Sequence, residues 1–288
     1  MKTLVTGANG QLGTEMRNIL EEKYPGHTLY TDVAELDITD ADAVKAFVRD
    51  NDITHIVNCA AYTAVDKAEE DKALSAAINI DAVRNLANAA DAVGAKVLHV
   101  STDYVFDGTA CRPYKESDKV NPVSQYGTTK RQGETALLAL APESIIVRTA
   151  WLYSPYGKNF VKTMIRLGRE RAVLKVVSDQ IGTPTYAADL AAAIYAILLS
   201  PQWIPGIYHF SDEGACSWYD FTKAIHRIAG ITTCDVQPIP TEDYPTAATR
   251  PFYSILDKSK IKATYGITIP HWEESLVKCI NQLKSETL

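Results

Sequence analysis

A tyrosine and a lysine four residues apart carry the sharpest chemical signal in this chain of 288 residues. They lie in Tyr126-Gly-Thr-Thr-Lys130, inside a stretch with helical character, residues 124–140. On a helix, positions i and i+4 share one face, about 6 Å apart along the axis. An ammonium group beside a phenol favours the phenolate, and moving the phenol pKa from about 10 to about 7 would require roughly 4 kcal/mol. The pair is a candidate for proton transfer, although Y-x-x-x-K also occurs by chance on solvated helix faces.

A hydroxyl group at the end of a predicted strand completes the set. Ser101 and Thr102 follow an apolar run, and Thr102 precedes Tyr126 by 24 positions. A hydroxyl in this position can hydrogen-bond a substrate carbonyl and stabilise the alkoxide that develops on it. We take Thr102 as the candidate; Ser101 competes with it, and a simple strand cap is the alternative.

Three glycines follow the first predicted strand, residues 2–6, at a G-x-x-G-x-x-G spacing. Gly7 can form the sharp turn, Gly10 can let a pyrophosphate approach the backbone, and Gly13 can pack a helix closely on the strand. The helix that follows directs its unpaired N–H groups at the phosphates. The spacing differs from the G-x-G-x-x-G of simple dehydrogenases, and a ligand-free turn is the alternative. The turn predicts a dinucleotide site that also includes Asn9, Gln11 and Leu12.

The next two strands end in residues that suit the rest of a dinucleotide. Asp32 ends the second strand and can bind the adenosine ribose, with a turn cap as its alternative role. Asp37 and Ile38 can border the adenine. Ala60 and Ala61 follow the third strand, and their small side chains let the chain run close under a cofactor.

The elements needed to position these residues alternate regularly up to residue 150. Strands are predicted at 2–6, 27–31, 54–58, 95–101 and 144–149, and helices at 10–23, 40–50, 66–93 (interrupted) and 124–140. This rhythm predicts an α/β, Rossmann-like, doubly wound parallel sheet. It loosens afterwards, into helices at 160–171, 186–200, 218–229 and 271–284 and strands at 174–177 and 206–210. We expect residues 1–150 to form the dinucleotide-binding core, with 172–205 returning to it, and 151–171 and 206–288 to form a smaller substrate-binding lobe.

Composition narrows the class of partner. The formal net charge is -6, which argues against nucleic-acid binding. The five cysteines form no C-x-x-C pair, so neither zinc nor a disulfide framework is expected. The longest apolar run, 190–199, is half a membrane span and predicts a buried helix, and no signal peptide is recognisable. We expect a cytoplasmic protein without membrane association.

These motifs, taken together, resemble those of the extended short-chain dehydrogenases/reductases almost end to end. The likeness is greatest to members that act on nucleotide-linked sugars. It rests on residues 7–13, 58–69, 101–108, Tyr126-Gly127-x-x-Lys130, 148–151, Asn159-Phe160, Asp179-Gln180-x-Gly182-x-Pro184-Thr185, Arg250-Pro251 and Leu256-Asp257. The stretches 64–69 and 101–106 are much more specific than any glycine motif.

The resemblance implies a reduction. A nicotinamide would deliver hydride to the C4 ketone of dTDP-4-dehydro-L-rhamnose, giving dTDP-L-rhamnose for cell-surface polysaccharide. Tyr126 would be the general acid, Lys130 would hold the nicotinamide ribose and tune Tyr126, and Thr102 would bind the ketone oxygen. The sugar pocket would be lined by Thr63 (also near the cofactor), Val65, Asp103, Tyr104 and Trp151, with Trp151 flat against the sugar ring. For the diphosphate the candidates are Asn159, Lys162, Arg166 and Arg250, of which Arg250 is favoured.

The resemblance also bears on cofactor and metal. Asp32 favours NADH, whereas the family is associated with NADPH, so we expect dual use of NADPH and NADH. Some members bind magnesium between subunits through glutamates, and Glu15 matches one such position. The second carboxylate, sought near residues 187–189, is shifted or missing. We therefore expect no essential metal, and a monomer or homodimer.

Two other functions remain open from the sequence. A nucleotide-sugar epimerase or dehydratase would share the fold, and Asp103 lies where a dehydratase carries a carboxylate, but Tyr104 follows where glutamate is more usual. A non-catalytic binding subunit, like the regulatory subunit of methionine adenosyltransferase, could relax the catalytic set. Here Thr102, Tyr126 and Lys130 are all present, which favours catalysis.

Overall fold

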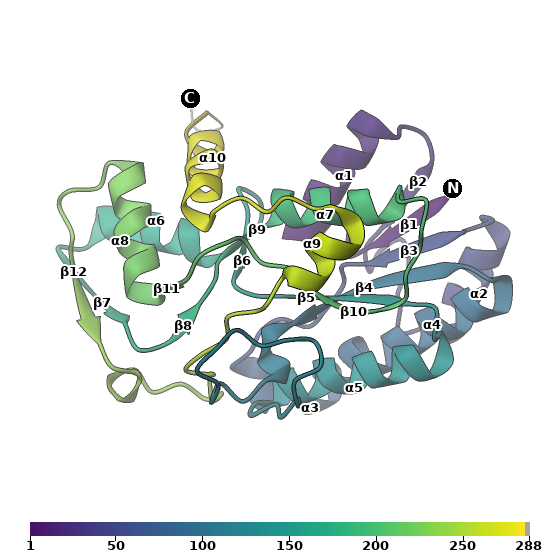
Figure 1. The fold of residues 1–288 in the computed structure, drawn as a ribbon, viewed down its shortest axis with the longest axis horizontal. Coiled ribbons are helices and arrows are strands. Elements are labelled where there is room, and N and C mark those ends of the chain that lie inside the picture. Colours follow the sequence, from purple (N-terminus) through teal and green to yellow (C-terminus); the bar gives the residue numbers. More distant parts are fainter. Residues whose placement is uncertain (286–288) are drawn as a thin grey trace.

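The structure, a computed structural model, describes residues 1–285 and is built around one six-stranded parallel sheet (Figure 1). The strand order is β2-β1-β3-β4-β5-β10. The chain therefore runs from β1 outward to β2 and then crosses back to β3, which leaves a topological switch between β1 and β3. The predicted doubly wound parallel sheet is confirmed. Its strands are β1 (Thr3–Thr6), β2 (Thr28–Thr31), β3 (His55–Asn58), β4 (Lys96–Thr102), β5 (Ile145–Thr149) and β10 (Gly206–His209).

Helices cover both faces of this sheet, as continuous apolar strands require. Helices α1 (Gln11–Lys23) and α7 (Ala187–Leu198) pack on one face with a core that includes Val5 and Val57. Helices α2 (Ala41–Asp50), α4 (Ala82–Val93) and α5 (Gln125–Leu140) pack on the other face, around Leu4 and Ile56. The two layers are visible above and below the sheet in Figure 1.

The alanine-rich stretch 66–93 is interrupted, as expected. It consists of a 3₁₀ turn η1 (Lys67–Glu69), helix α3 (Lys72–Ala76), the π-helical turn η2 (Ala77–Asp81) and then α4. Asn79 lies in the π turn and is 1% exposed; its side chain accepts from the backbone N–H of Tyr62 and donates to the Tyr62 carbonyl. Because π turns shift the helical register locally, this amide reaches the loop after β3 and holds it.

A smaller lobe lies beside the sheet, on the left of Figure 1, with its own apolar cluster. Its elements are α6 (Phe160–Glu170), β7 (Val173–Val177), α8 (Trp218–Ala229), β12 (Asp235–Ile239) and α10 (Trp272–Ser285), with β7 parallel to β12. Short segments complete the fold: β6 (Leu152–Tyr153), β8 (Ile181–Gly182), β9 (Thr185–Tyr186), β11 (Cys216–Ser217), the turns η3 (Asp103–Val105) and η4 (Thr241–Asp243), and α9 (Ser259–Tyr265).

Two strands lie on the other side of the expected division. β10 was expected in the lobe but pairs with β5 in the main sheet, because Ile207 and Tyr208 align with the buried Ile146 and Val147. β7 was expected to return to the core but lies in the lobe. Its Val173 is 46% exposed, which suits a two-stranded sheet and not the interior of a parallel one.

Within residues 1–285, no helix combines the length and apolar character needed to cross a bilayer. The run 190–199 falls largely on α7, where Leu190, Ile194 and Ile197 are buried against the sheet. The prediction of a buried helix is confirmed.

Candidate active site

The glycine turn lies at the carboxyl end of β1, beside the switch point. Gly7 has φ +65°, and a Cβ added there would lie 2.7 Å from Cα of Ala60. A Cβ on Gly13 would lie 2.2 Å from the Gly7 carbonyl oxygen, so Gly13 packs α1 on the turn. Gly10 caps α1 without a side-chain hydrogen bond, so the first N–H groups of the helix remain available to an anion.

A cavity of about 390 Å³ opens at this turn. Seven predicted cofactor residues line it: Gly7, Gly10, Asp32, Asp37, Ile38, Ala60 and Ala61. Seven further lining residues were missed: Thr6, Val33, Leu36, Thr39, Cys59, Leu74 and Ile78. Leu74 and Ile78 are apolar residues four positions apart in a helical stretch, and this spacing was a signal in the sequence that could have identified them. In the structure Leu74 is 51% exposed, which is unusual for a large apolar side chain.

Seven other predicted cofactor residues do not line this cavity; two of them, Tyr126 and Lys130, lie on α5. The side chain of Leu12 is 4% exposed and lies in the core, so only its backbone N–H, at the open N-terminus of α1, can contact a cofactor. Asn9 donates its backbone N–H to Asp32 Oδ2 (3.1 Å), holding that carboxylate at the turn. Gln11 accepts from Asn159 (2.9 Å), Gly13 packs the turn, and Thr63 is exposed on the loop after β3.

Helix α5 brings Tyr126 to Thr102. Ser124 caps the helix by accepting from the Gly127 N–H (3.2 Å). Gly127 lets the helix approach turn η3, because a Cβ there would lie 2.2 Å from the Tyr104 carbonyl oxygen. The Thr102 hydroxyl lies near the Tyr126 phenol and lowers its pKa, and the rings of Tyr104 and Tyr126 meet edge to face at 5.5 Å. The two predicted hydroxyl groups are therefore adjacent.

The pKa of Tyr126 lies above its ordinary value, whereas lowering toward 7 was expected for a closed site with a cationic nicotinamide beside the phenol. Burial raises it to about 12, with the negative Asp103 adding to the rise and the Thr102 hydrogen bond opposing it. The expected lowering by an adjacent ammonium is absent because Lys130 bonds elsewhere. Its Nζ donates to the Val100 carbonyl (2.7 Å) and lies 3.2 Å from His99 Nε2. Tyr126 thus keeps its proton near neutral pH, which is the form a proton donor needs.

The residues after Thr102 are tied to the site. Asp103 is 2% exposed, its Oδ1 accepts from the Thr102 hydroxyl (3.1 Å), and burial raises its pKa to about 6. Tyr104, whose pKa burial also raises, donates its backbone N–H to Thr102 Oγ1 (3.2 Å). Both of these residues, predicted to bind substrate, therefore contact Thr102.

Trp151 departs from its expected place against the sugar ring. Its indole stacks on that of Trp218, with centroids 3.5 Å apart and planes 10° apart. Gly182 lies on it so closely that an added Cβ would come within 2.6 Å of Trp151 Cε2. With φ +48°, Trp151 occupies a backbone region rare for a bulky residue. One indole face is therefore already covered by the lobe.

Arg250 is held at the boundary between the lobe and the sheet. It forms a bidentate pair with Asp66, at 2.6 Å and 3.1 Å, and Asp66 also accepts the Ala248 N–H (3.1 Å). Arg250 retains 22% of its side-chain surface. Val65, adjacent to Asp66, is half-buried on the same loop.

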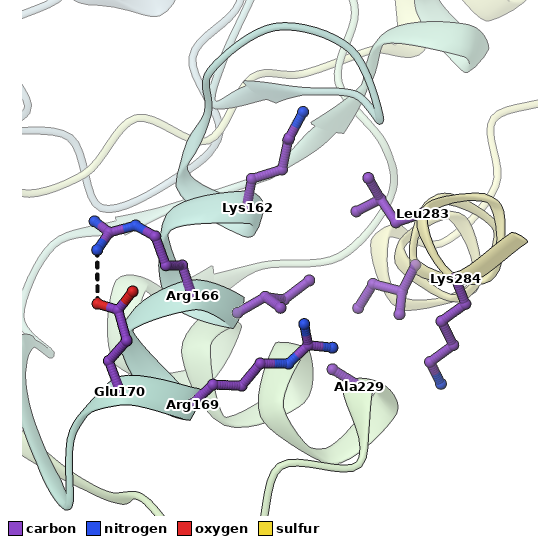
Figure 2. Close-up of a pocket in the computed structure, with 9 residues that line it drawn as sticks. Lys162, Arg166, Arg169, Glu170, Ala229, Leu283 and Lys284 are labelled. Carbon is purple, nitrogen blue, oxygen red and sulfur yellow. Dashed lines mark hydrogen bonds and ion pairs between the residues drawn. The ribbon is translucent and has the colours of Figure 1, made fainter. Parts of the chain in front are cut away.

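The three other residues predicted to bind the diphosphate have different contacts in the structure. Asn159 caps α6, and its amide donates to Ser154 O (2.6 Å) and Gln11 Oε1 (2.9 Å), so the structure corrects its role to one of bracing. Lys162 and Arg166 line a separate groove between α6, α8 and α10, where Arg166 pairs with Glu170 (Figure 2).

The metal expectation concerns Glu15, which is buried in α1. Ser154 Oγ lies 3.4 Å from its carboxylate. Among residues 1–285, no group of three or more His, Cys, Asp or Glu side chains has the geometry of a metal site.

Comparisons with known proteins agree with this geometry. The family model for the RmlD substrate binding domain matches residues 1–285. A dTDP-4-dehydrorhamnose reductase from Aggregatibacter actinomycetemcomitans is 43% identical over 96% of this chain and 97% of its own length. The crystal structure of a dTDP-4-dehydrorhamnose reductase from Clostridium acetobutylicum matches with a TM-score of 0.95 and 47% identity, over 99% of this chain and 100% of that one.

A third relative carries a cofactor. The dTDP-4-dehydrorhamnose reductase from Bacillus anthracis, solved in complex with NADP, has a TM-score of 0.92 and 42% identity, over 98% of this chain and 100% of that one. The family model thus matches nearly the whole chain, and these three relatives share 42%, 43% and 47% of their aligned residues with it. The chain belongs to the RmlD substrate-binding-domain family, among the dTDP-4-dehydrorhamnose reductases.

Proposed function

We propose that this protein reduces the C4 ketone of dTDP-4-dehydro-L-rhamnose to the alcohol, giving dTDP-L-rhamnose, with NADPH or NADH as the reductant. The observation that carries the proposal is the adjacency of the Thr102 and Tyr126 hydroxyls at the carboxyl end of β4. The chain that carries these two hydroxyls is 43% identical to a dTDP-4-dehydrorhamnose reductase.

The residues divide the work as follows. A bound reduced nicotinamide supplies the hydride that adds to C4. The Thr102 hydroxyl, whose single proton is donated to Asp103 Oδ1 in the structure, turns to donate it to the ketone oxygen, where negative charge develops. Tyr126, protonated because its pKa is raised to about 12, transfers its proton to that oxygen. Tyr104 and Val65 border the sugar, and Arg250 binds a diphosphate oxygen with the donors not held by Asp66 or by the Ala248 carbonyl.

The cavity beside Gly7 and Gly10 suits the adenosine half of the dinucleotide. The open N-terminus of α1 fits the pyrophosphate, and Asp32 accepts from ribose hydroxyls. None of the residues that line the cavity, all in the described part, is Lys or Arg. Because nothing there selects a 2'-phosphate while a relative binds NADP, we propose that both cofactors are used. Values of kcat/KM within a thousandfold of each other support dual use; a wider gap contradicts it.

The same proposal includes no essential magnesium, a monomeric or homodimeric state, and a cytoplasmic location. We expect full turnover after treatment with EDTA. Light scattering should give the mass of one or two chains. Loss of turnover that added magnesium restores would overturn the metal part.

The test of function is the absorbance at 340 nm. The protein is mixed with NADPH and with substrate generated in place by the preceding enzymes of the pathway. A stoichiometric fall separates a reductase from an epimerase, which regenerates its cofactor. The fall should slow by about 10²–10⁴-fold in Tyr126→Phe, with cofactor binding retained. No fall from folded protein that binds NADPH would refute the proposal.

A further inference from the structure

Four buried polar side chains form a continuous hydrogen-bonded line beneath the site. The Thr6 hydroxyl donates to Asn58 Oδ1 (2.7 Å), Asn58 Nδ2 lies 3.0 Å from His99 Nδ1, and His99 Nε2 lies 3.2 Å from Lys130 Nζ. Each of the four residues is 2% exposed or less. Thr6, Asn58 and His99 come from three adjacent strands, β1, β3 and β4, and Lys130 comes from α5.

The backbone fixes the direction of these bonds. Asn58 Oδ1 also faces the Ala60 backbone N–H (3.1 Å), which can only donate, so that atom must be the oxygen. The amide nitrogen of Asn58 therefore donates to His99, and Nδ1 of His99 carries no proton. An imidazole without a proton on Nδ1 is neutral and carries its proton on Nε2.

That proton points at Lys130. An ammonium on Lys130 would place donors against a donor, whereas an uncharged amine can accept from Nε2–H and still donate to the Val100 carbonyl. We propose that His99 is a positioning residue that, with its tautomer fixed by Asn58, holds Lys130 as an uncharged amine until a dinucleotide binds.

The surroundings of Lys130 shift it toward the amine form. Burial lowers the Lys130 pKa to about 8, where amine and ammonium are equally populated, and the bond from His99 Nε2–H must extend this effect to lower pH; burial also lowers the pKa of His99. Glu134, one turn along α5, favours the ammonium, but both its oxygens bind Arg148, at 2.8 Å and 2.7 Å. Cys59, the remaining titratable neighbour, stays a thiol because burial raises its pKa to about 12.

Binding of an anionic dinucleotide then requires a proton. Its hydroxyl and phosphate oxygens favour the ammonium form of Lys130, so the site takes up a proton from solvent as the ligand binds. This role of Lys130 rests on the reduction proposed above; the tautomer of His99 does not.

The test is nitrogen NMR of protein labelled with ¹⁵N-histidine, which distinguishes the two neutral tautomers. His99, assigned by its absence in His99→Gln, should be in the Nε2–H form from pH 5 to 8. Asn58→Asp replaces the amide donor with a carboxylate of the same shape, so His99 should change to the Nδ1–H form. An Nδ1–H tautomer or an imidazolium in the parent protein overturns the proposal, whether or not either variant folds.

Calorimetry measures the proton directly. Titration of NADPH at pH 8 in two buffers of different ionisation enthalpy should show proton uptake by the parent and less by Asn58→Asp. Thr3→Val is the matched control, because Thr3 is buried on the same strand, lies outside the cavity and has a hydroxyl without a partner in the described part of the chain, and it should keep the parent tautomer and proton uptake. Equal uptake by all three overturns the coupling. The expected tautomer in a protein without turnover would refute the proposed function alone, and active protein with the other tautomer would refute this inference alone.

Discussion

Gly127 of α5 lies directly against the backbone carbonyl oxygen of Tyr104, with room for a hydrogen but not for a methyl group. A Cβ at this position would come within 2.2 Å of that oxygen. This contact joins the helix that carries Tyr126 to the turn that follows Thr102. The distance between the two catalytic hydroxyls therefore depends on an atom that residue 127 lacks.

Gly127→Ala should separate the catalytic pair. The added methyl must push α5 away from η3, and overpacking of this kind costs about 1–3 kcal/mol. We expect kcat to fall by about tenfold or more, with a smaller change in NADPH affinity, because the glycine turn at Gly7 is untouched. Steady-state kinetics and fluorescence titration measure the two effects. Gln132→Ala, on the exposed side of the same helix, is the control; equal kcat in both variants would contradict the argument.

Asp32→Asn should shift the balance between cofactors. The carboxylate is held by the N–H groups of Asn9 (3.1 Å) and Val33 (2.9 Å), where it accepts ribose hydroxyls and repels a 2'-phosphate. We expect kcat/KM for NADH to fall by about tenfold, while that for NADPH is unchanged or rises. Glu35→Gln changes a neighbouring carboxylate that accepts from the Asp32 backbone N–H (2.9 Å). The same shift in both variants would show that overall charge, and not Asp32, is responsible.

Arg250→Lys should weaken binding of the nucleotide sugar. Lysine cannot reproduce the bidentate pair with Asp66 and still present donors to a phosphate. The expected result is a KM for the dTDP-sugar raised by about tenfold with kcat nearly unchanged, from initial rates at saturating NADPH. Arg227→Lys, on an exposed pair with Glu273, should have no effect. A fall in kcat at constant KM would place Arg250 outside the substrate site.

Asp103 predicts a dependence of stability on pH. Burial raises its pKa from an ordinary value of 3.8 to about 6, so the folded state binds the proton more tightly than the unfolded chain does. This contribution is complete below about pH 4 and is lost as the pH rises through about 6; two units correspond to about 3 kcal/mol. Asp103→Asn, which mimics the protonated acid, should flatten the stability profile between pH 4 and 7 in urea unfolding.

The control for that profile has the opposite sign. The hydroxyl and backbone N–H of Thr109 hold the pKa of Asp107 below its usual range. Its contribution is therefore present above pH 4 and lost at lower pH. Asp107→Asn should remove stability at neutral pH and leave the Asp103 transition in place. An unchanged slope between pH 4 and 7 in Asp103→Asn would refute the assignment.

Local signals in the sequence determined much of the fold. The apolar strand runs, the turn at Gly7 and the helix carrying Tyr126 are set by neighbouring residues, through hydrophobic periodicity and glycine geometry. Strand β10 was predicted to lie in the lobe because the sequence of these four residues, Gly206–His209, is compatible with pairing either in the main sheet or in the lobe. Only pairing with β5, which is distant in sequence, decides between them.

The sequence by itself also indicated proton-transfer chemistry, because a hydroxyl, a phenol and an amine in that order are properties of residue type and spacing, and the family resemblance added the reduction. The tertiary structure decided their protonation. Burial raises the pKa of Tyr126, and the line from Thr6 through Asn58 and His99 turns Lys130 away from it. The tertiary structure also decided that the Asn159 amide bonds the Ser154 carbonyl and that the Trp151 indole stacks on Trp218. Desolvation and hydrogen-bond direction depend on groups brought together from separate strands, and spacing along the chain does not contain them.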